Sequence, residues 1–269
     1  MVEKNYPFDI LGNVVLVKFA SETKISEKRK FAAKLLKETS ATTILEKVGK
    51  FSGRLRKQKT KYVAGEKTKE VRYRENDCVF RFNIDTTYFS PRLSNERKEI
   101  ASQIKKGENV LVMFAGVAPY SIVIAKHSKA ERVYSNEINR EANKYAQMNI
   151  ELNKLKDKVI LLPGDVKKVF RTGVPPTPPK VQIPKTFDVI VMPRPNLKNS
   201  FLKEAFSLSK KGTRIFYYGF CKDEDKEKLI EGIKEEARVA KKKIKILKTK
   251  KAGEIGPYKM RLRVDFMVI

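Results

Sequence analysis

The sequence predicts an α/β protein, a doubly wound, mostly parallel, Rossmann-like sheet preceded by a small α+β domain. From residue 106 onward, short apolar runs typical of buried strands alternate with stretches of helical periodicity, and this alternation indicates a parallel sheet. Earlier in the chain the alternation is absent, and Lys and Arg are dense. We therefore expect a small domain over residues 1–95 and a larger α/β domain over residues 96–269.

In the small domain, an alternating apolar stretch at residues 13–19 predicts a strand. Residues 26–38 carry apolar side chains at helical spacing, and Ser26 is a suitable N-cap for a helix there. Residues 50–74 are rich in Lys and Arg and poor in apolar side chains, after which residues 78–84 alternate again as a strand. The small domain is thus expected to have a basic flank.

In the larger domain, strands and helices are expected in alternation. The strands are predicted at residues 110–114, 132–136, 159–162, 188–192, 213–218 and 261–269, and the helices at 119–127, 140–155, 197–209 and 223–240. Residues 172–184 contain five of the twelve prolines, which predicts an extended surface insertion.

The charge of the chain indicates a polyanionic partner. Lys and Arg number 59 against 31 acidic residues, which gives a formal net charge of +28. The cations run through the same segments that carry the apolar periodicity, so we expect a folded basic surface. Nucleic acid fits such a surface better than a membrane does.

Several classes of protein are disfavoured by the sequence. Cys78 and Cys221 are too few for a disulfide scaffold, and with His127 as the single histidine they cannot form a four-ligand zinc site. The N-terminus lacks the apolar core of a signal peptide, and the longest uncharged run, residues 110–125, is shorter than a membrane span. We expect a cytoplasmic protein with no metal site and no membrane partner.

Residues suited to a nucleoside follow three successive predicted strands. Gly116 lies in the turn after the first strand, Glu137 ends the second, and Asp165 follows the third. In an open parallel sheet such positions share one edge, where carboxylates can accept hydrogen bonds from ribose hydroxyls and from an adenine amine. Gly116 alone is weak evidence, because a tight strand-to-helix turn also uses glycine. The chain has no GxxxxGK[ST] phosphate loop, so adenosine fits better than a pyrophosphate.

A series of short motifs carries a family resemblance. Residues 88–97 read Tyr-Phe-Ser-Pro-Arg-Leu-Ser-Asn-Glu-Arg, and Phe-Ala-Gly-Val (114–117), Asn-Glu-Ile-Asn (136–139), Asn-Ile-Glu-Leu-Asn-Lys (149–154) and Gly-Asp-Val (164–166) follow. In this order they resemble the class I tRNA guanine-37 N1-methyltransferases of the archaeal and eukaryotic type. The resemblance runs from about residue 6 to residue 269. It implies S-adenosyl-L-methionine as cofactor, the tRNA anticodon stem-loop as partner and a monomer.

The resemblance also implies roles for individual residues. Glu96 would be the general base and Arg56 would reach the target base, although a carboxylate in the first turn of a helix is also favoured by the helix dipole alone. The residues expected at the cofactor are Tyr88, Arg92, Phe114, Ala115, Gly116, Glu137, Ile138, Asp165, Val166 and Met192. The residues expected at the substrate are Pro193, Pro195, Arg54, Lys57 and Lys59, the last three at tRNA phosphates.

Three positions depart from the family pattern. Val112 stands where an acid is usual, Ala118 where a glycine is usual, and Pro193 where an asparagine would recognise guanine. The resulting Met-Pro-Arg-Pro segment at residues 192–195 leaves two acceptors open. One is N1 of guanosine 37, and the other is carbon 7 of 4-demethylwyosine at position 37 of phenylalanine tRNA, alone or in addition.

Two further alternatives remain at this stage. The departures are also consistent with a non-catalytic RNA-binding protein that has a degenerate methyltransferase fold. Transfer of an aminocarboxypropyl group from the same cofactor fits less well, because the related family differs after the fourth strand, at residues 192–195. The resemblance begins at the second domain of the family, so no counterpart of its N-terminal domain is expected.

Overall fold

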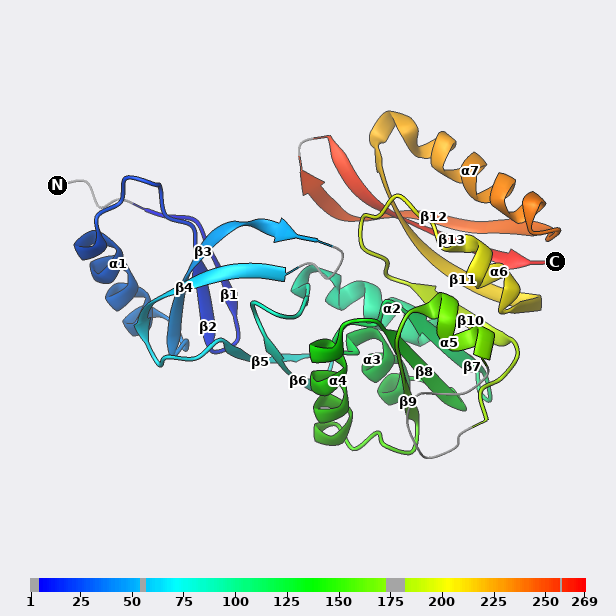
Figure 1. The fold of residues 1–269 in the computed structure, drawn as a ribbon, viewed down its shortest axis with the longest axis horizontal. Coiled ribbons are helices and arrows are strands. Elements are labelled where there is room, and N and C mark those ends of the chain that lie inside the picture. The colour runs from blue at the N-terminus through cyan, green and yellow to red at the C-terminus, as the bar shows by residue number, and fades with distance from the viewer. Residues whose placement is uncertain (1–4, 54–56, 173–181, 257) are drawn as a thin grey trace. The chain divides into compact units, whose positions relative to one another are not determined.

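The computed structural model describes residues 5–53, 57–172, 182–256 and 258–269. The chain divides into two compact units, Met1–Pro91 and Arg92–Ile269, each with its own sheet (Figure 1). Among the described residues, no helix is long and apolar enough to span a membrane.

The small unit contains a four-stranded sheet in the order β1-β2-β3-β4. Its strands are β1 (Phe8–Leu11), β2 (Val14–Val17), β3 (Thr43–Ser52) and β4 (Lys57–Gly65). Helix α1 (Ile25–Glu38) connects β2 to β3, which pair in parallel, and buries Ala32 and Leu35 against Val15, Val17 and Ile44. This small apolar cluster is the core of the sheet and helix.

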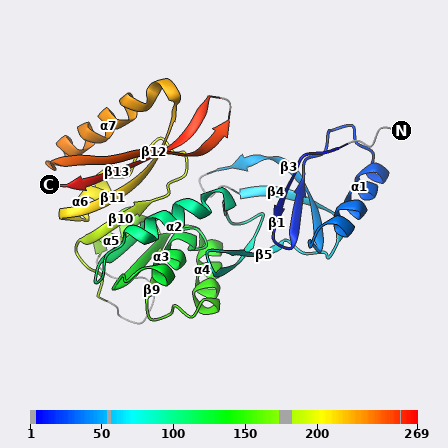
Figure 2. The ribbon, with the colours of Figure 1, turned by 180° about the vertical axis from the view of Figure 1, so that it is seen from behind.

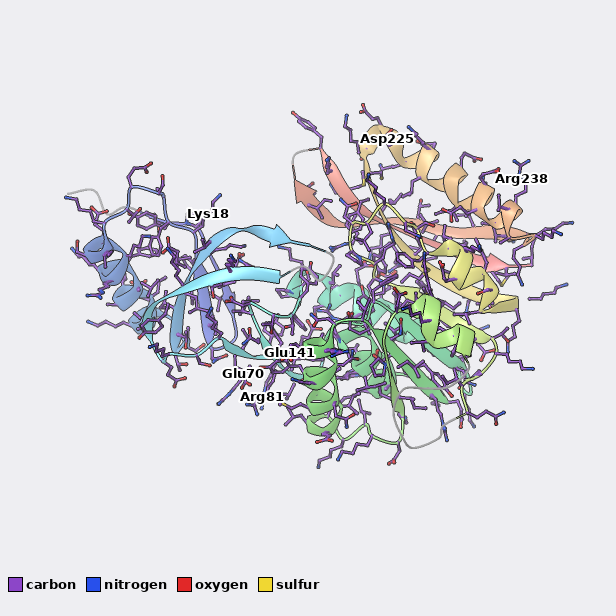
Figure 3. The ribbon with its side chains drawn as sticks, viewed as in Figure 1. Lys18, Glu70, Arg81, Glu141, Asp225 and Arg238 are labelled. Carbon is purple, nitrogen blue, oxygen red and sulfur yellow. The ribbon has the colours of Figure 1, made fainter. Side chains whose placement is uncertain are left out.

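A hairpin of β5 (Glu70–Glu75) and β6 (Cys78–Asn83) completes the small unit. Glu70 and Arg81 face each other across it, and Arg81 Nε donates a 2.9 Å hydrogen bond to Glu70 Oε1 (Figure 3). Asn13, in the turn between β1 and β2, accepts from the Arg72 backbone N–H at 2.7 Å and donates to the Glu70 carbonyl at 3.2 Å. One amide side chain therefore links the hairpin to the sheet.

One expectation for the small unit is corrected. Helix α1 begins at Ile25 and its N-cap position is Lys24, so Ser26 lies inside the helix and is not the N-cap. The basic segment at residues 50–74, in which no strand was predicted, contains β4 and most of β5. In β4, exposed Lys59 alternates with the buried polar side chains Gln58 and Thr60, so a search for apolar periodicity misses the strand.

The large unit contains a seven-stranded sheet in the order β12-β13-β11-β10-β7-β8-β9. Five strands are parallel: β7 (Asn109–Met113), β8 (Arg132–Glu137), β9 (Val159–Pro163), β10 (Phe187–Met192) and β11 (Ser209–Lys222). Strand β13 (Lys259–Val268) runs antiparallel to β11, and β12 (Ile244–Gly256) runs antiparallel to β13. The predicted mostly parallel sheet is confirmed.

Helices cover both faces of this sheet (Figures 1 and 2). On one face lie α2 (Ser94–Gln103), α3 (Pro119–His127) and α4 (Arg140–Leu152); on the other lie α5 (Val166–Thr172), α6 (Leu202–Ser207) and α7 (Lys226–Val239). The main apolar core forms between the sheet and the second group of helices, where Leu111, Ile190 and Ile215 of the central strands meet Phe206 and Ile233.

Two parts of the large unit differ from expectation. The helix expected at residues 197–209 is short, Leu202–Ser207, because β11 already begins at Ser209. Strand β12 was not expected: lysines occupy positions 245, 248, 250 and 251, although Ile244 and Ile246 pack against the core. Lysines on the outermost strand of a sheet discourage pairing with a further strand, which explains the pattern. Most of the proline-rich segment 172–184 lies outside the described residues.

Candidate active site

The ends of β7, β8 and β9 bring the predicted cofactor residues together. These strands are neighbours and parallel, so their carboxyl ends share one edge of the sheet. Glu137 Oε2 accepts a 2.8 Å hydrogen bond from the Gly116 N–H, and Oε1 accepts one at 2.7 Å from the Asn139 N–H. The Gly164 N–H donates to the Glu137 carbonyl at 2.8 Å. Glu137 is thus the point where the three strand-end loops meet.

The loop after β7 has an unusual backbone. Phe114, Gly116 and Ala118 have φ values of 61°, 59° and 66°, which lie in the left-handed region. Ala118 is fully buried and is the N-cap residue of α3, whereas the ring of Phe114 is only partly buried and packs edge-on against Phe201 at 5.0 Å. Left-handed conformations cost a non-glycine residue roughly 1 kcal/mol or more and concentrate at functional sites.

Three asparagines, for which no role was predicted from the sequence, hold these loops. Asn136 is buried, and its Nδ2 donates to the carbonyls of Leu162 (2.7 Å) and Gly164 (3.1 Å). Asn139 caps α4 through the Glu141 N–H, and Asn143 Nδ2 donates to the Glu137 carbonyl at 2.8 Å. Asparagines repeated at the end of a predicted strand and shortly after it are the sequence signal that could have revealed these hydrogen bonds.

Asp165 also has a local structural role. Its Oδ1 accepts from the Lys167 N–H at 3.0 Å, at the start of α5. The neighbouring Val166 is buried in the core, as is Met192 at the end of β10, while Ile138 is half-buried. These residues line or support the strand-end edge, but their contact with a cofactor remains a prediction.

The Met-Pro-Arg-Pro segment after β10 is organised by its arginine. Arg194 is buried, and its Nη2 donates to the carbonyls of Leu197 (2.6 Å) and Asn199 (2.9 Å). Its guanidinium also lies over the ring of Tyr217, 5.5 Å from the centroid, and burial lowers the pKa of Arg194. Arg194 therefore closes its own loop. Pro193 and Pro195 are half-buried beside it.

Glu96, the expected general base, lies in the first turn of α2 and is buried. Its Oε2 accepts from Arg263 Nη1 at 2.7 Å and from the Tyr218 hydroxyl at 3.1 Å. Lys250 Nζ lies 2.7 Å from Oε1. The carboxylate is therefore held by groups from three strands, β11, β12 and β13.

Arg263 is fully buried and joins three carboxylates. Besides Glu96, it contacts Asp265 through Nε at 2.8 Å and Glu99 through Nη2 at 2.6 Å. Burial disfavours the charged guanidinium, but the hydrogen bonds to Glu99 and Asp265 outweigh it and raise the pKa of Arg263 above its usual value. Arg263 thus fixes one face of α2 to β13.

A hydrogen-bond chain connects this ion-pair region to the start of α3. The hydroxyl of Tyr120, in the first turn of α3, lies 3.0 Å from that of Tyr218, which in turn contacts Glu96. Burial raises the pKa of Tyr218 well above its usual value and that of Tyr120 to about 12. Both hydroxyls therefore stay protonated at neutral pH. Tyr120 donates to Tyr218, and Tyr218 donates to the carboxylate of Glu96.

The remaining predicted residues, Arg92 and Tyr88, belong to different units of the chain. Arg92 is exposed and lines an open groove of about 1100 Å³ with the β12–β13 hairpin. Tyr88 belongs to the small unit and is half-buried, and the neighbouring Phe89 packs against Phe82 with ring centroids 4.7 Å apart.

Two of the basic residues expected at the substrate, Lys57 and Lys59, lie on β4. Lys57 begins this strand and Lys59 is exposed on it. Arg54 and Arg56 lie outside the described residues, so their roles stay predictions. Within the described ranges, no group of three His, Cys, Asp or Glu side chains could hold a metal ion.

The sheet order and the strand-end loops define a Rossmann-like domain of the methyltransferase class. The family model described as the TRM5/TYW2 methyltransferase domain matches residues 71–247, and the chain belongs to this family. The resemblance noted in the sequence is therefore confirmed, and the protein is an enzyme.

Individual relatives cover nearly the whole chain. The tRNA (guanine(37)-N(1))-methyltransferase Trm5b of Pyrococcus abyssi is 32% identical over 97% of this chain and 74% of its own length. The tRNA (guanine(37)-N(1))/4-demethylwyosine(37)-methyltransferase Taw22 of Nanoarchaeum equitans is 32% identical over 97% of this chain and 99% of its own. The crystal structure of the Pyrococcus abyssi Trm5b matches with a TM-score of 0.81 and 31% identity over 97% and 74% of the two chains. A complex of aTrm5 with tRNALeu matches with a TM-score of 0.82 and 26% identity over 98% and 72%.

The ion pairs of Glu99 predict a pH dependence of stability. Hydrogen bonds from Arg263, followed by those from Lys250 and Lys248, lower the pKa of Glu99 from 4.5 to about 2. A carboxylate with a lowered pKa in the folded state stabilises the fold above its unfolded pKa, and this contribution is lost as the pH falls from about 4.5 to about 2. Urea midpoints should fall over this range in the wild type and fall less in Glu99→Gln. Glu231→Gln, at an exposed site on α7, is the control. If the urea midpoint depends on pH in the same way in the wild type and in Glu99→Gln, the lowered pKa of Glu99 does not contribute to stability.

Proposed function

We propose that this protein transfers a methyl group from S-adenosyl-L-methionine to N1 of guanosine 37 of tRNA, next to the anticodon. The observation that carries the proposal is the junction at Glu137 in a chain of the TRM5/TYW2 family: its carboxylate accepts from the Gly116 N–H, and its backbone carbonyl accepts from the Gly164 N–H of the β9 loop. Relatives named for this reaction match nearly the whole chain, and a structure titled as a complex with tRNA has the same fold.

The side chains at the strand ends fit the adenosine part of this cofactor. Glu137 and Asp165 are acceptors at the ends of adjacent strands, whereas ribose hydroxyls and the adenine amine are donors. The partly buried ring of Phe114 adds an apolar surface at the same edge. We infer that Glu137 holds the ribose, that Asp165 receives the amine, and that Gly116 allows close approach. When bound, the cofactor supplies an electrophilic methyl group on a sulfonium.

The acceptor nitrogen requires a base. Guanine N1 carries a proton at neutral pH, so this proton must leave as the N–C bond forms, and Glu96 is the carboxylate that we assign to receive it. Negative charge then develops toward O6, where a guanidinium such as Arg56 would stabilise it. Much of the acceleration would come from holding the methyl group and the nitrogen in line at about 3 Å.

One observation favours carbon 7 of 4-demethylwyosine as a second acceptor. Pro193 has no polar side chain with which to read a guanine edge, and Arg194 is turned into its own loop toward Leu197 and Asn199. Taw22 of Nanoarchaeum equitans, similar over almost its full length, is named for both acceptors. A carbon that gains a methyl group must also lose a proton, so Glu96 would serve either reaction.

The first prediction of the proposed function concerns cofactor binding. Glu137→Ala should weaken the binding of S-adenosyl-L-methionine by about 1.5–3 kcal/mol, the range for hydrogen bonds to a charged group. Glu141→Ala is the control, because Glu141 carries the same charge on the exposed side of α4 and pairs with Lys144 (Figure 3). Calorimetry that finds equal affinity for the wild type and Glu137→Ala would contradict the pocket. No binding to the wild type would instead favour a non-catalytic RNA-binding protein.

The second prediction concerns tRNA. Lys59 and Lys61 are exposed on β4, so Lys59→Glu/Lys61→Glu should weaken tRNA binding and reduce the slope of log affinity against log salt by roughly 1–2 units. Filter binding of tRNA at several salt concentrations measures this slope. The equal charge change Lys228→Glu/Lys234→Glu on α7 should have a smaller effect. Equal losses in the two variants would argue against the small unit as the tRNA-binding part.

The third prediction concerns the base and the choice of acceptor. Glu96→Gln should retain cofactor and tRNA binding but lose roughly 10²–10⁴-fold in the single-turnover rate, the usual contribution of a general base. Pro193→Asn should shift the preference toward unmodified guanosine, since an amide can read a base edge. Nucleoside mass spectrometry on tRNA with guanosine or 4-demethylwyosine at position 37 measures both effects. It also separates methyl from aminocarboxypropyl products. An undiminished Glu96→Gln rate on both tRNAs would eliminate Glu96 as the base.

A further inference from the structure

Glu96 shares both of its cations with a second carboxylate on the same helix. Glu99 lies one turn along α2, and Arg263 bridges the two residues, with Nη1 2.7 Å from Glu96 and Nη2 2.6 Å from Glu99. Lys250 bridges them as well, with Nζ 2.7 Å from Glu96 Oε1 and in contact with Glu99 Oε2. Two acids therefore compete for the same two cations.

The two carboxylates differ in their surroundings. Glu96 is buried, with a side-chain exposure of 6%, whereas the side chain of Glu99 is 27% exposed and also contacts Lys248 at 3.1 Å. The lowered pKa of Glu99, about 2, keeps it ionised throughout the range in which an enzyme works. Glu99 is thus a permanent anion beside a carboxylate that has to gain and lose a proton.

This arrangement has a consequence for a general base, and the following step rests on the function proposed above. A carboxylate with cations bound to both oxygens accepts a proton less readily, because each cation favours the charged form. Oε2 of Glu96 is held by Arg263 and Tyr218, so Oε1, which faces Lys250, is the oxygen better placed to receive the proton. Lys250 must then release Oε1 of Glu96 while its charge stays paired with another carboxylate.

We propose that Glu99 is a positioning residue that takes over Lys250 from Glu96 during methyl transfer. As the N–C bond forms, the N1–H bond breaks and its proton passes to Oε1 of Glu96, which becomes a neutral acid. Lys250 stays paired with Glu99, so the cation is never left without a counter-charge. The side chain of Lys250 is 36% exposed, and the proton leaves to water at this solvent-facing side of the pair after the product departs.

The test is a rescue experiment in single turnovers with saturating cofactor and tRNA. In Glu99→Gln, Lys250 keeps Glu96 as its carboxylate partner in the ion-pair region and Arg263 keeps Glu96 and Asp265, so the methyl-transfer rate should fall about tenfold with an unchanged KM for tRNA. Removing the competing cation in Glu99→Gln/Lys250→Met should bring the rate back to within about threefold of the wild type. Glu99→Gln/Lys248→Met is the matched control, since Lys248 lies on the same strand and contacts Glu99. Lys250 still contacts Glu96 in this variant, so its methyl-transfer rate should stay low.

Thermal unfolding of the same variants separates this role from a structural one. Glu99→Gln/Lys250→Met has lost two members of the ion-pair region and should be no more stable than Glu99→Gln, so a recovered rate cannot come from a recovered fold. A double variant that is as slow as Glu99→Gln would overturn the proposal. So would a wild-type rate in Glu99→Gln while Glu96→Gln is inactive. An active Glu96→Gln would instead refute Glu96 as the base, which is a different outcome.

Discussion

Burying the charge of Arg263 is the constraint on which the outer part of the large unit depends. A guanidinium without exposure to water is strongly unfavourable unless carboxylates surround it, and Glu96, Glu99 and Asp265 supply them. Two of these acids lie on α2 and the third on β13, so satisfying one charge fixes the helix against the antiparallel side of the sheet. The geometry of Glu96 follows from this requirement.

The strand-end edge is organised by a different principle. There the carboxylate of Glu137 accepts from the backbone N–H groups of Gly116 and Asn139, and its backbone carbonyl accepts from the Gly164 N–H, so one residue joins the loops after three strands. Asn136, Asn139 and Asn143 complete the frame with neutral amides. Backbone N–H groups and asparagine amides thus hold the edge where a nucleoside is assigned to bind, whereas ion pairs hold the carboxylate that is assigned to exchange a proton.

The success of sequence prediction varied with the physical signal available. Strands β7, β9 and β10 and helix α3 were predictable because most of their side chains are apolar, and Gly116, Glu137 and Asp165 could be placed together because carboxyl ends of neighbouring parallel strands share an edge. Strands β4 and β12 were missed because their alternation is between polar or basic residues. The ion-pair region could not be foreseen, since Glu96 and Arg263 are 167 positions apart and the antiparallel return of β13 brings them together.

The left-handed backbone at Ala118 bears on how the chain tolerates a departure from its family. The methyl group disfavours φ of 66° by roughly 1–2 kcal/mol in the folded state. The same methyl group narrows the conformations open to the unfolded chain, which favours alanine over glycine by about 0.4–1 kcal/mol. The two effects oppose each other, so part of the strain in the native loop is offset by the lower entropy of the denatured ensemble. Because the strain is the larger of the two, alanine at this turn still lowers the stability of the protein relative to glycine, but by less than its dihedral angle alone suggests.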